Sequence, residues 1–256
     1  MSCLLPRFGY LSDADIEEKT SEFDVVTTAD RAAEAAITAR VRERWPRTVV
    51  IGEESAGSEA VLREQLGAES ALVLDPLDGT KNFVSGLPLF AVMAAVMRRG
   101  QIVGSVIHDP VTRSSALASD GTGAWLRGPD GAARRLRVSP PVPAEKMEAI
   151  AGMRFAPEPA RTALQANLPK LAGYTWFRCA GHEYRLAAGG HVDLLCYHRL
   201  MPWDHAPGWL LHREAGGFSA HFDGSPFDPG RMTGGLLCAS DRDSWNEART
   251  ALLPAP

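Results

Sequence analysis

The stretch from residue 72 to residue 82, Leu-Val-Leu-Asp-Pro-Leu-Asp-Gly-Thr-Lys-Asn, constrains the fold more than any other part of the chain. Its apolar residues run into turn-forming residues, a pattern that predicts a buried strand whose carboxyl end opens to solvent. Asp75 and Asp78 at this end would repel each other and resist losing their hydration. A divalent cation would relieve both effects, and carboxylate oxygens suit Mg²⁺ best. We therefore expect a magnesium site here.

The two residues directly after these acids add a second feature. Gly79 and Thr80 offer backbone N–H groups where a turn or helix begins, which is a place for a phosphate group. Thr80 could instead simply cap the helix that follows. A metal and a phosphate in one turn indicate phosphoryl chemistry.

Another pair of acids follows a second short strand. Residues 48–51 predict this strand, and it stops before Glu53 and Glu54. Acids at a strand end are usually solvated turn residues. If the two strands are neighbours, however, Glu53 or Glu54 could share a cation with Asp75.

Two further aspartates lie at helix starts, where structural roles would be enough to explain them. Asp30 falls in the first turn of an alanine-rich helix that ends near residue 46, and it would complement the helix dipole. Asp204 precedes a helix expected over residues 207–215 and would serve as its N-cap. Only the combination with the strand-end acids makes these two residues candidates for a metal or catalytic site.

The rest of the chain predicts two differently built parts. Residues 89–126 carry apolar runs separated by turns, which is typical of an antiparallel meander. Residues 158–253 alternate between helical and strand patterns, which indicates strands covered by helices. We expect an N-terminal α+β lobe over residues 1–140 with most of the metal ligands. A C-terminal α/β lobe over residues 141–256 would supply Asp204 and the substrate wall, and the two would form one compact unit.

Composition limits the partners of the protein. The 256 residues are 45% hydrophobic and 23% charged, and the net charge of −4 is unsuited to non-specific nucleic-acid binding. The four cysteines are scattered and predict reduced thiols in a cytosol. No apolar run approaches the roughly 20 residues of a membrane span, and residues 1–23 predict a short or loosely held segment rather than a signal peptide. We expect a cytoplasmic protein with no membrane or nucleic-acid partner.

Taken together, these segments resemble the inositol monophosphatase family, within the lithium-sensitive, Mg²⁺-dependent phosphatase superfamily. The motifs are Asp24 to Asp30, Gly52-Glu53-Glu54, Asp75-Pro-Leu-Asp-Gly-Thr80, and Trp203-Asp204 with the helix end Glu214-Ala-Gly-Gly217. They run in the family's order from about Lys19 to the last helix. The resemblance implies an α+β fold, a layered α-β-α-β-α sandwich shared with fructose-1,6-bisphosphatase. It also implies lithium sensitivity and a homodimer.

The resemblance further implies the ligands of two or three Mg²⁺ ions. Glu53, Asp75 and the backbone carbonyl of Leu77 would hold one ion. Asp75, Asp78 and Asp204 would hold a second, with Asp75 bridging the two. A third, weaker ion would depend on Glu53 and waters.

Catalytic and phosphate-binding roles are implied in the same way. Thr80, hydrogen-bonded to Asp30, would orient and deprotonate the attacking water, and Glu53 would belong to the same catalytic set. The amides of Gly79 and Thr80 would hold phosphate oxygens. Lys19 matches a basic position near this site.

This chain departs from the family at the expected substrate wall. Members that take inositol phosphates usually carry a glutamate seven residues before the aspartate of Trp-Asp, and here that position is Tyr197. Where the family has small residues, this chain has Gly181, His182, Glu183 and Tyr184. We expect Gly181 to contact the substrate and the bulkier His182, Glu183 and Tyr197 to face the leaving group. Glu183 could hold an amine, or these side chains could instead pack against the core or a neighbouring subunit.

The function that the sequence predicts is a Mg²⁺-dependent phosphomonoesterase acting on a small, inositol-phosphate-like ester without a covalent intermediate. The alternatives within enzymes are a histidinol-phosphate phosphatase, a 3′-phosphoadenosine-type nucleotidase and a sugar bisphosphatase. The alternative outside enzymes is a catalytically idle, metal-binding dimeric module. Retention of every acid that the metals need favours the enzyme.

Overall fold

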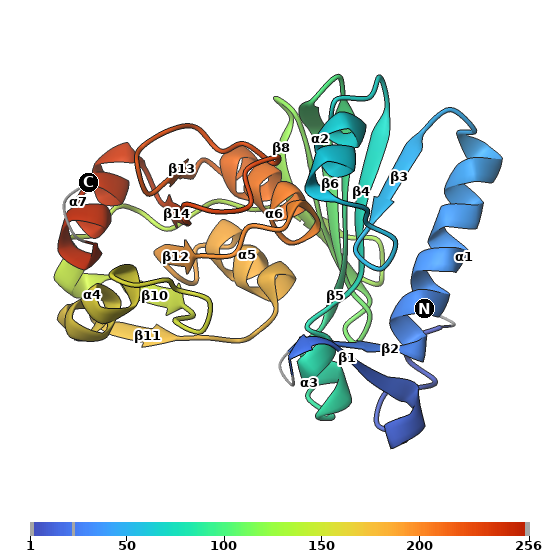
Figure 1. Ribbon diagram of the computed structural model, residues 1–256. Coiled ribbons are helices and arrows are strands. Elements are labelled where there is room, and N and C mark those ends of the chain that lie inside the picture. The colour runs from blue at the N-terminus through green and yellow to red at the C-terminus, as the bar shows by residue number, and fades with distance from the viewer. Residues whose placement is uncertain (1–2, 22–23, 254–256) are drawn as a thin grey trace.

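The computed structural model describes residues 3–21 and 24–253, which form two large sheets and a hairpin (Figure 1). The larger sheet has the strand order β3 (Val49–Gly52), β4 (Ala71–Asp78), β5 (Ala91–Arg98), β6 (Gln101–Asp109), β7 (Ser114–Ser119), β8 (Gly123–Arg127) and β9 (Ala133–Arg135). The smaller has the order β11 (Gly173–Thr175), β10 (Glu148–Ala151), β12 (Leu194–Tyr197), β14 (Leu236–Ala239) and β13 (Phe218–His221). The hairpin is β1 (Ile16–Ser21) with β2 (Asp24–Thr27).

Helices separate and cover the sheets. The α-helices are α1 (Thr28–Arg44), α2 (Glu59–Leu66), α3 (Thr80–Val84), α4 (Ala160–Asn167), α5 (Ala180–Ala188), α6 (Pro202–Glu214) and α7 (Arg242–Leu252). Short 3-10 turns lie at Asp13–Asp15, Ala144–Lys146 and Leu168–Lys170. Among the described residues, no helix is both long and apolar enough to cross a bilayer.

The layers follow the order α-β-α-β-α, which confirms the expected fold class. α1 and α2 lie against the larger sheet near β3 and β4, and α4 and α7 lie on the outer side of the smaller sheet (Figure 1). α5 and α6 lie between the sheets and contact both. The expected lobe boundary near residue 140 falls between the last strand of one sheet and the first strand of the other.

The central helices are buried because they carry small and apolar residues on several faces. Tyr184 of α5 and Leu210 of α6 belong to one hydrophobic cluster with Met93 of β5 and Leu195 of β12. A Cβ on Gly208 would overlap the Tyr184 ring, so glycine allows this close approach. One core therefore joins α5, α6 and both sheets.

The N-terminal segment is more firmly packed than its polar composition predicts. Leu4 is buried, and the Phe8 ring lies 5.4 Å from that of Phe83 and 4.9 Å from that of Phe90. These few apolar residues anchor the described part of the segment against α3 and the start of β5.

Helix α6 begins five residues before the expected start at 207, so the N-cap assignment of Asp204 is wrong. Met201 is the N-cap, Pro202 occupies the first turn, and Pro207 lies inside the helix. A proline suits the first helical turn because its missing N–H would have no partner there. Asp204 therefore projects from the first turn of the helix.

Candidate metal centre

The acids that follow β3 and β4 meet because the two strands are parallel neighbours. Gly52 pairs with Leu74, and the Glu53 N–H donates to the Leu74 carbonyl at 3.1 Å. Parallel neighbours bring their carboxyl ends to the same edge of a sheet. Glu53 therefore lies beside Asp75.

A β-bulge at the end of β4 aims both aspartates at the central helices. In a regular strand, residues three apart point to opposite faces. Here the register shifts between Asp75, which pairs with Met93, and Asp78, which pairs with Ala91. The extra residue lets Asp75 approach α6 while Asp78 contacts α5. The direction of Asp78 thus depends on this irregularity.

Three carboxylates from distant segments form the centre. The ligand oxygens of Glu53, Asp75 and Asp204 all lie within 4.8 Å of one another. Burial, and next the negative charge of Glu53, raise the pKa of Asp75 and that of Asp204 well above the ordinary carboxyl range. These hard oxygen donors carry more negative charge than the neighbouring Lys19 ammonium supplies in positive charge, which fits Mg²⁺.

Asp78 makes different contacts in this structure and lies outside that three-residue group. Its carboxylate accepts hydrogen bonds from the amides of Gly181 at 2.6 Å and Ala180 at 3.1 Å. The Cys179 thiol donates to it at 2.9 Å. Burial nonetheless raises the pKa of Asp78 to about 6. Its role as a metal ligand stays a prediction, and Cys179 is a neighbour that the sequence pattern did not indicate.

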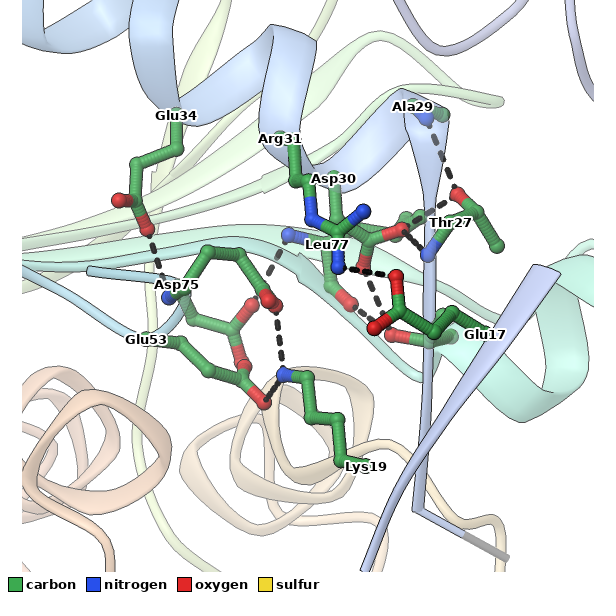
Figure 2. A network of polar contacts seen from close by, with 12 residues as sticks. Glu17, Lys19, Thr27, Ala29, Asp30, Arg31, Glu34, Glu53, Asp75 and Leu77 are labelled. Carbon is green, nitrogen blue, oxygen red and sulfur yellow. Dashed lines mark hydrogen bonds and ion pairs between the residues drawn. The ribbon is translucent and has the colours of Figure 1, made fainter. Parts of the chain in front are cut away.

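Thr80 and Asp30 come together from two helices. The Thr80 hydroxyl lies 3.0 Å from Asp30 Oδ1 and 2.8 Å from the carbonyl oxygen of Leu77, the expected backbone ligand. The other oxygen of Asp30 accepts hydrogen bonds from the amide and hydroxyl of Thr27, the N-cap of α1 (Figure 2). Asp30 therefore has its structural role in a capping box and also contacts Thr80. Burial raises its pKa to about 6.

Gly79 connects β4 to α3 with a left-handed backbone. Its φ is 85°, and a Cβ there would lie 2.8 Å from the Leu89 carbonyl oxygen. Only glycine fits this turn without strain. Thr80 is consequently the first residue of α3 rather than its N-cap.

Lys19 contacts both of the glutamates that the sequence left open as metal ligands (Figure 2). Its Nζ lies 2.8 Å from Glu53 Oε1 and 2.7 Å from Glu54 Oε1. Glu53 also belongs to the acidic cluster, whereas the Glu54 backbone is held by Glu34, whose carboxylate accepts the Glu54 N–H at 2.8 Å. Burial raises the pKa of Glu54 to about 7. Burial opposes the charge of Lys19, but Glu53 and Glu54 outweigh that effect and raise its pKa.

A cavity of about 200 Å³ opens beside these acids, and Glu183 and Tyr197 line it. Glu183 is only 1% exposed, and its Oε1 accepts the Phe177 N–H at 3.1 Å. Burial raises the pKa of Glu183 to about 8, so the side chain is a poor counter-ion for an amine at neutral pH. The Tyr197 hydroxyl is buried near the Glu183 carboxylate, but no partner within the described ranges has the geometry of a hydrogen bond to it.

The two other residues of the expected substrate wall are not among those that line the cavity. His182 Nε2 lies 3.2 Å from the Phe90 carbonyl oxygen, so its ring faces the start of β5. Gly181 donates its amide to Asp78, and a Cβ there would lie 2.9 Å from Ala91 Cβ. Gly181 thus permits the close approach of α5 to the larger sheet.

Sequence reasoning missed the positive side of the cavity. The basic residues that line it are Lys81, Arg154, Arg178 and Arg199. Lys81 follows the phosphate-type turn directly and could have been noticed there. The three arginines belong to no motif, and only the fold brings them together.

Known proteins match this chain along nearly its whole length. The model of the inositol monophosphatase family matches residues 2–255. Nus factor SuhB from Pseudomonas aeruginosa is 37% identical over 221 residues, which cover 82% of this chain and 76% of that protein. Inositol-1-monophosphatase from Caulobacter vibrioides is 31% identical over 241 residues, which cover 92% and 90%. The crystal structure of extragenic suppressor protein SuhB from Bartonella henselae superposes with a TM-score of 0.84 at 28% identity, covering 98% of this chain and 93% of that one.

Proposed function

This chain belongs to the inositol monophosphatase family, and on that premise we propose that it is a Mg²⁺-dependent phosphomonoesterase that hydrolyses a small phosphate ester. The observation that carries the proposal is the convergence of Glu53, Asp75 and Asp204 within 4.8 Å. These acids come from separate segments. Thr80 follows Asp78 directly after the turn at Gly79, and its hydroxyl contacts Asp30 of α1. Such a set has no evident structural purpose, because burying mutually repelling acids destabilises the fold.

The same acids would hold the metal, with Asp78 and the Leu77 carbonyl as further ligands and two or three ions per site. Bound Mg²⁺ would neutralise the phosphate and bring the pKa of a coordinated water toward neutrality. The amides of Gly79 and Thr80 would hold phosphate oxygens as their charge redistributes. This supply of positive charge makes an enzyme nucleophile unnecessary.

Thr80 and Asp30 would position the attacking water. When the Thr80 hydroxyl donates to Asp30, its own lone pairs point outward and accept a proton of the water. The water oxygen then forms a bond to phosphorus as the ester P–O bond breaks. The water gives up its proton through Thr80 toward Asp30, and the leaving alkoxide takes a proton from solvent.

The direct test is phosphate release by the purified protein against a panel of phosphate esters. We expect activity with Mg²⁺ and none with EDTA, and we expect Asp75→Asn to lose activity by at least about a hundredfold. Asp243→Asn, an exposed aspartate in the first turn of α7, is the matched control and should keep full activity. Metal-independent turnover, or an active Asp75→Asn variant, would overturn the proposal.

A second candidate function is a non-catalytic one, as a metal-binding dimeric interaction module. It is supported by the similarity to a protein named Nus factor SuhB. The retained acids together with Thr80 and Asp30 favour the enzyme, because an idle module has no need of them. Homodimer formation, lithium sensitivity, a cytoplasmic location and the absence of nucleic acid among its partners remain parts of the proposal. The net charge of −4 supports the last of these.

A further inference from the structure

We propose that the substrate of this protein carries a second anionic group on its leaving group, and that Arg178, assisted by Arg154 and Arg199, binds it. This inference rests on the proposed phosphomonoesterase function and specifies its substrate class. The second group is a phosphate or a carboxylate, since both present oxygen pairs that match a guanidinium.

The charges around the cavity are segregated. Asp78 and Asp204 line it on the side of the acidic cluster, where they are expected to meet metal. The remaining acid of the lining, Glu183, is 1% exposed and has its Oε1 engaged by the Phe177 amide. The other charged residues of the lining are all basic: Lys81, Arg154, Arg178 and Arg199. A leaving group that extends away from the metal side therefore meets cationic side chains.

Arg178 is the residue that points most directly to a ligand. It lies in the turn before α5 with φ of 57°, a left-handed backbone that is unfavourable for an arginine. Arg178 as a residue is half-buried, yet within the described part of the chain its guanidinium makes no hydrogen bond, ion pair or ring contact. Removing a charge from water without a partner is costly. An anion in the cavity would supply the missing partner.

Arg154 and Arg199 are held at the cavity by aromatic rings. The Arg154 guanidinium lies 5.2 Å from the centre of the Trp176 ring, and that of Arg199 lies 5.6 Å from the Phe155 ring. Stacking on a ring fixes the orientation of a guanidinium, so both positive charges are held beside the cavity. A Cβ on Gly152 would lie 2.8 Å from the Trp176 indole nitrogen, so glycine permits the indole to sit there.

This arrangement disfavours two of the leaving groups considered above. An amine, as in histidinol phosphate, would be repelled by the basic residues and would find Glu183 already hydrogen-bonded. A neutral polyol such as inositol would leave the charge of Arg178 uncompensated. A bisphosphate or a phosphorylated hydroxy acid would satisfy it.

The test compares matched esters that differ only in the second anion. We would measure kcat/KM with Mg²⁺ for 2-phosphoglycerate against glycerol 2-phosphate, and for adenosine 3′,5′-bisphosphate against adenosine 3′-monophosphate. We expect at least one doubly anionic member to be preferred by about tenfold or more, since a charge-assisted hydrogen bond supplies a factor of that order. A larger preference in the glycerate pair would identify the second group as a carboxylate, and a larger preference in the adenosine pair would identify it as a phosphate.

Variants of Arg178 then test whether this residue causes the preference for a second anion. Arg178→Gln should lose most of the preference, mainly through KM, while the singly anionic ester changes by less than about threefold. Arg178→Lys, which keeps the charge, should retain part of it. Arg40→Gln, an arginine on α1 whose side chain is 84% exposed, is the matched control and should behave as wild type.

The outcomes separate this inference from the proposed function. Absence of turnover with every ester would contradict the proposed phosphomonoesterase activity. The anion site could then still be tested by comparing the binding of 2-phosphoglycerate and glycerol 2-phosphate by calorimetry. Turnover without preference for a second anion would overturn the inference alone. So would an Arg178→Gln variant that loses activity equally on all esters, or one that changes the oligomeric state in size-exclusion chromatography, because Arg178 would then be a structural or interface residue.

Discussion

The hydroxyl of Thr80 lies 3.0 Å from a carboxylate oxygen of Asp30, on a helix that the chain reaches fifty residues earlier. A hydroxyl has one proton, so it donates to Asp30 or to the Leu77 carbonyl but not fully to both. A cation bound at the Leu77 carbonyl would favour donation to Asp30. A metal bound there would in this way be linked to the Thr80–Asp30 pair through one hydrogen atom.

The first prediction concerns this pair. Thr80→Val should lower kcat by about a hundredfold or more, whereas Thr80→Ser should retain most activity, since only the hydroxyl takes part in proton transfer. Steady-state kinetics with saturating Mg²⁺ would measure both. Unchanged melting temperatures would show that the fold is intact. A Thr80→Val variant with kcat near that of wild type would exclude the role of the hydroxyl.

A second prediction concerns Lys19 and its ion pair with Glu53. Because its ammonium group occupies the position of a cation beside the cluster, Lys19→Met should let activity saturate at a Mg²⁺ concentration several-fold lower. Arg31→Met, which removes an exposed ion pair with Glu17, serves as the control and should not shift the Mg²⁺ dependence. Titration of activity against free Mg²⁺ measures the effect. A rightward shift for Lys19→Met would show that Lys19 helps to hold the metal site rather than competing with it.

The third prediction is that the acidic cluster destabilises the protein when metal is removed. In EDTA, Asp204→Asn should raise the free energy of unfolding by roughly 1–3 kcal/mol, because it removes one of several repelling charges. Adding Mg²⁺ should stabilise the wild type and have little effect on the variant. Thermal and urea unfolding with and without Mg²⁺ would measure both. A variant that is less stable than the wild type in EDTA would show that Asp204 has a structural role that outweighs repulsion.

A fourth prediction concerns acid stability and the buried His212. Its Nδ1 lies 3.0 Å from Ser219 Oγ, and burial lowers its pKa to about 4. In the unfolded chain His212 binds a proton below about pH 6.5, whereas in the folded protein it binds this proton only below about pH 4. The contribution of His212 is therefore fully present above pH 6.5 and is lost as the pH falls through this window, by up to roughly 3 kcal/mol.

Urea unfolding between pH 7.5 and pH 4.5 would test this dependence. His212→Gln should flatten the decline, because glutamine can bond Ser219 but does not titrate. His191→Gln, at an exposed position, is the control and should follow the wild-type curve. Parallel curves for His212→Gln and wild type would place the acid sensitivity elsewhere.

Much of the architecture could be predicted because its signals are local or shared with a family. The apolar run before Asp75 predicts β4, and the alanine-rich stretch predicts α1 with its capping threonine. The start of α6 could not be read in the same way. Pro202 and Pro207 both suit a first helical turn, and only the burial of Trp203 and Ala206 between the sheets decides between them.

The candidate site was predictable where its residues follow strand ends and unpredictable where tertiary contacts choose among them. Both Glu53 and Glu54 follow β3, and only the packing of α6 against the larger sheet shows that Glu53 lies with Asp75 and Asp204. The hydrogen bonds that Asp78 accepts depend on the approach of α5, which no spacing in the sequence indicates. Arg178 is visible as a ligand-binding candidate only from its backbone conformation and surroundings.

The sandwiched position of α6 has a consequence for how this protein matures. Asp204 reaches Asp75 only when α6 is enclosed between the two sheets. The cluster is therefore absent from a nascent chain whose C-terminal half has not yet been synthesised. During synthesis, the first half would emerge with most of its acids but without the last. Tight binding of the metal would then require that the whole chain has folded. The bound cation would stabilise the folded protein only after α6 has packed between the sheets. Catalytic competence would arrive in a single step at the end of folding.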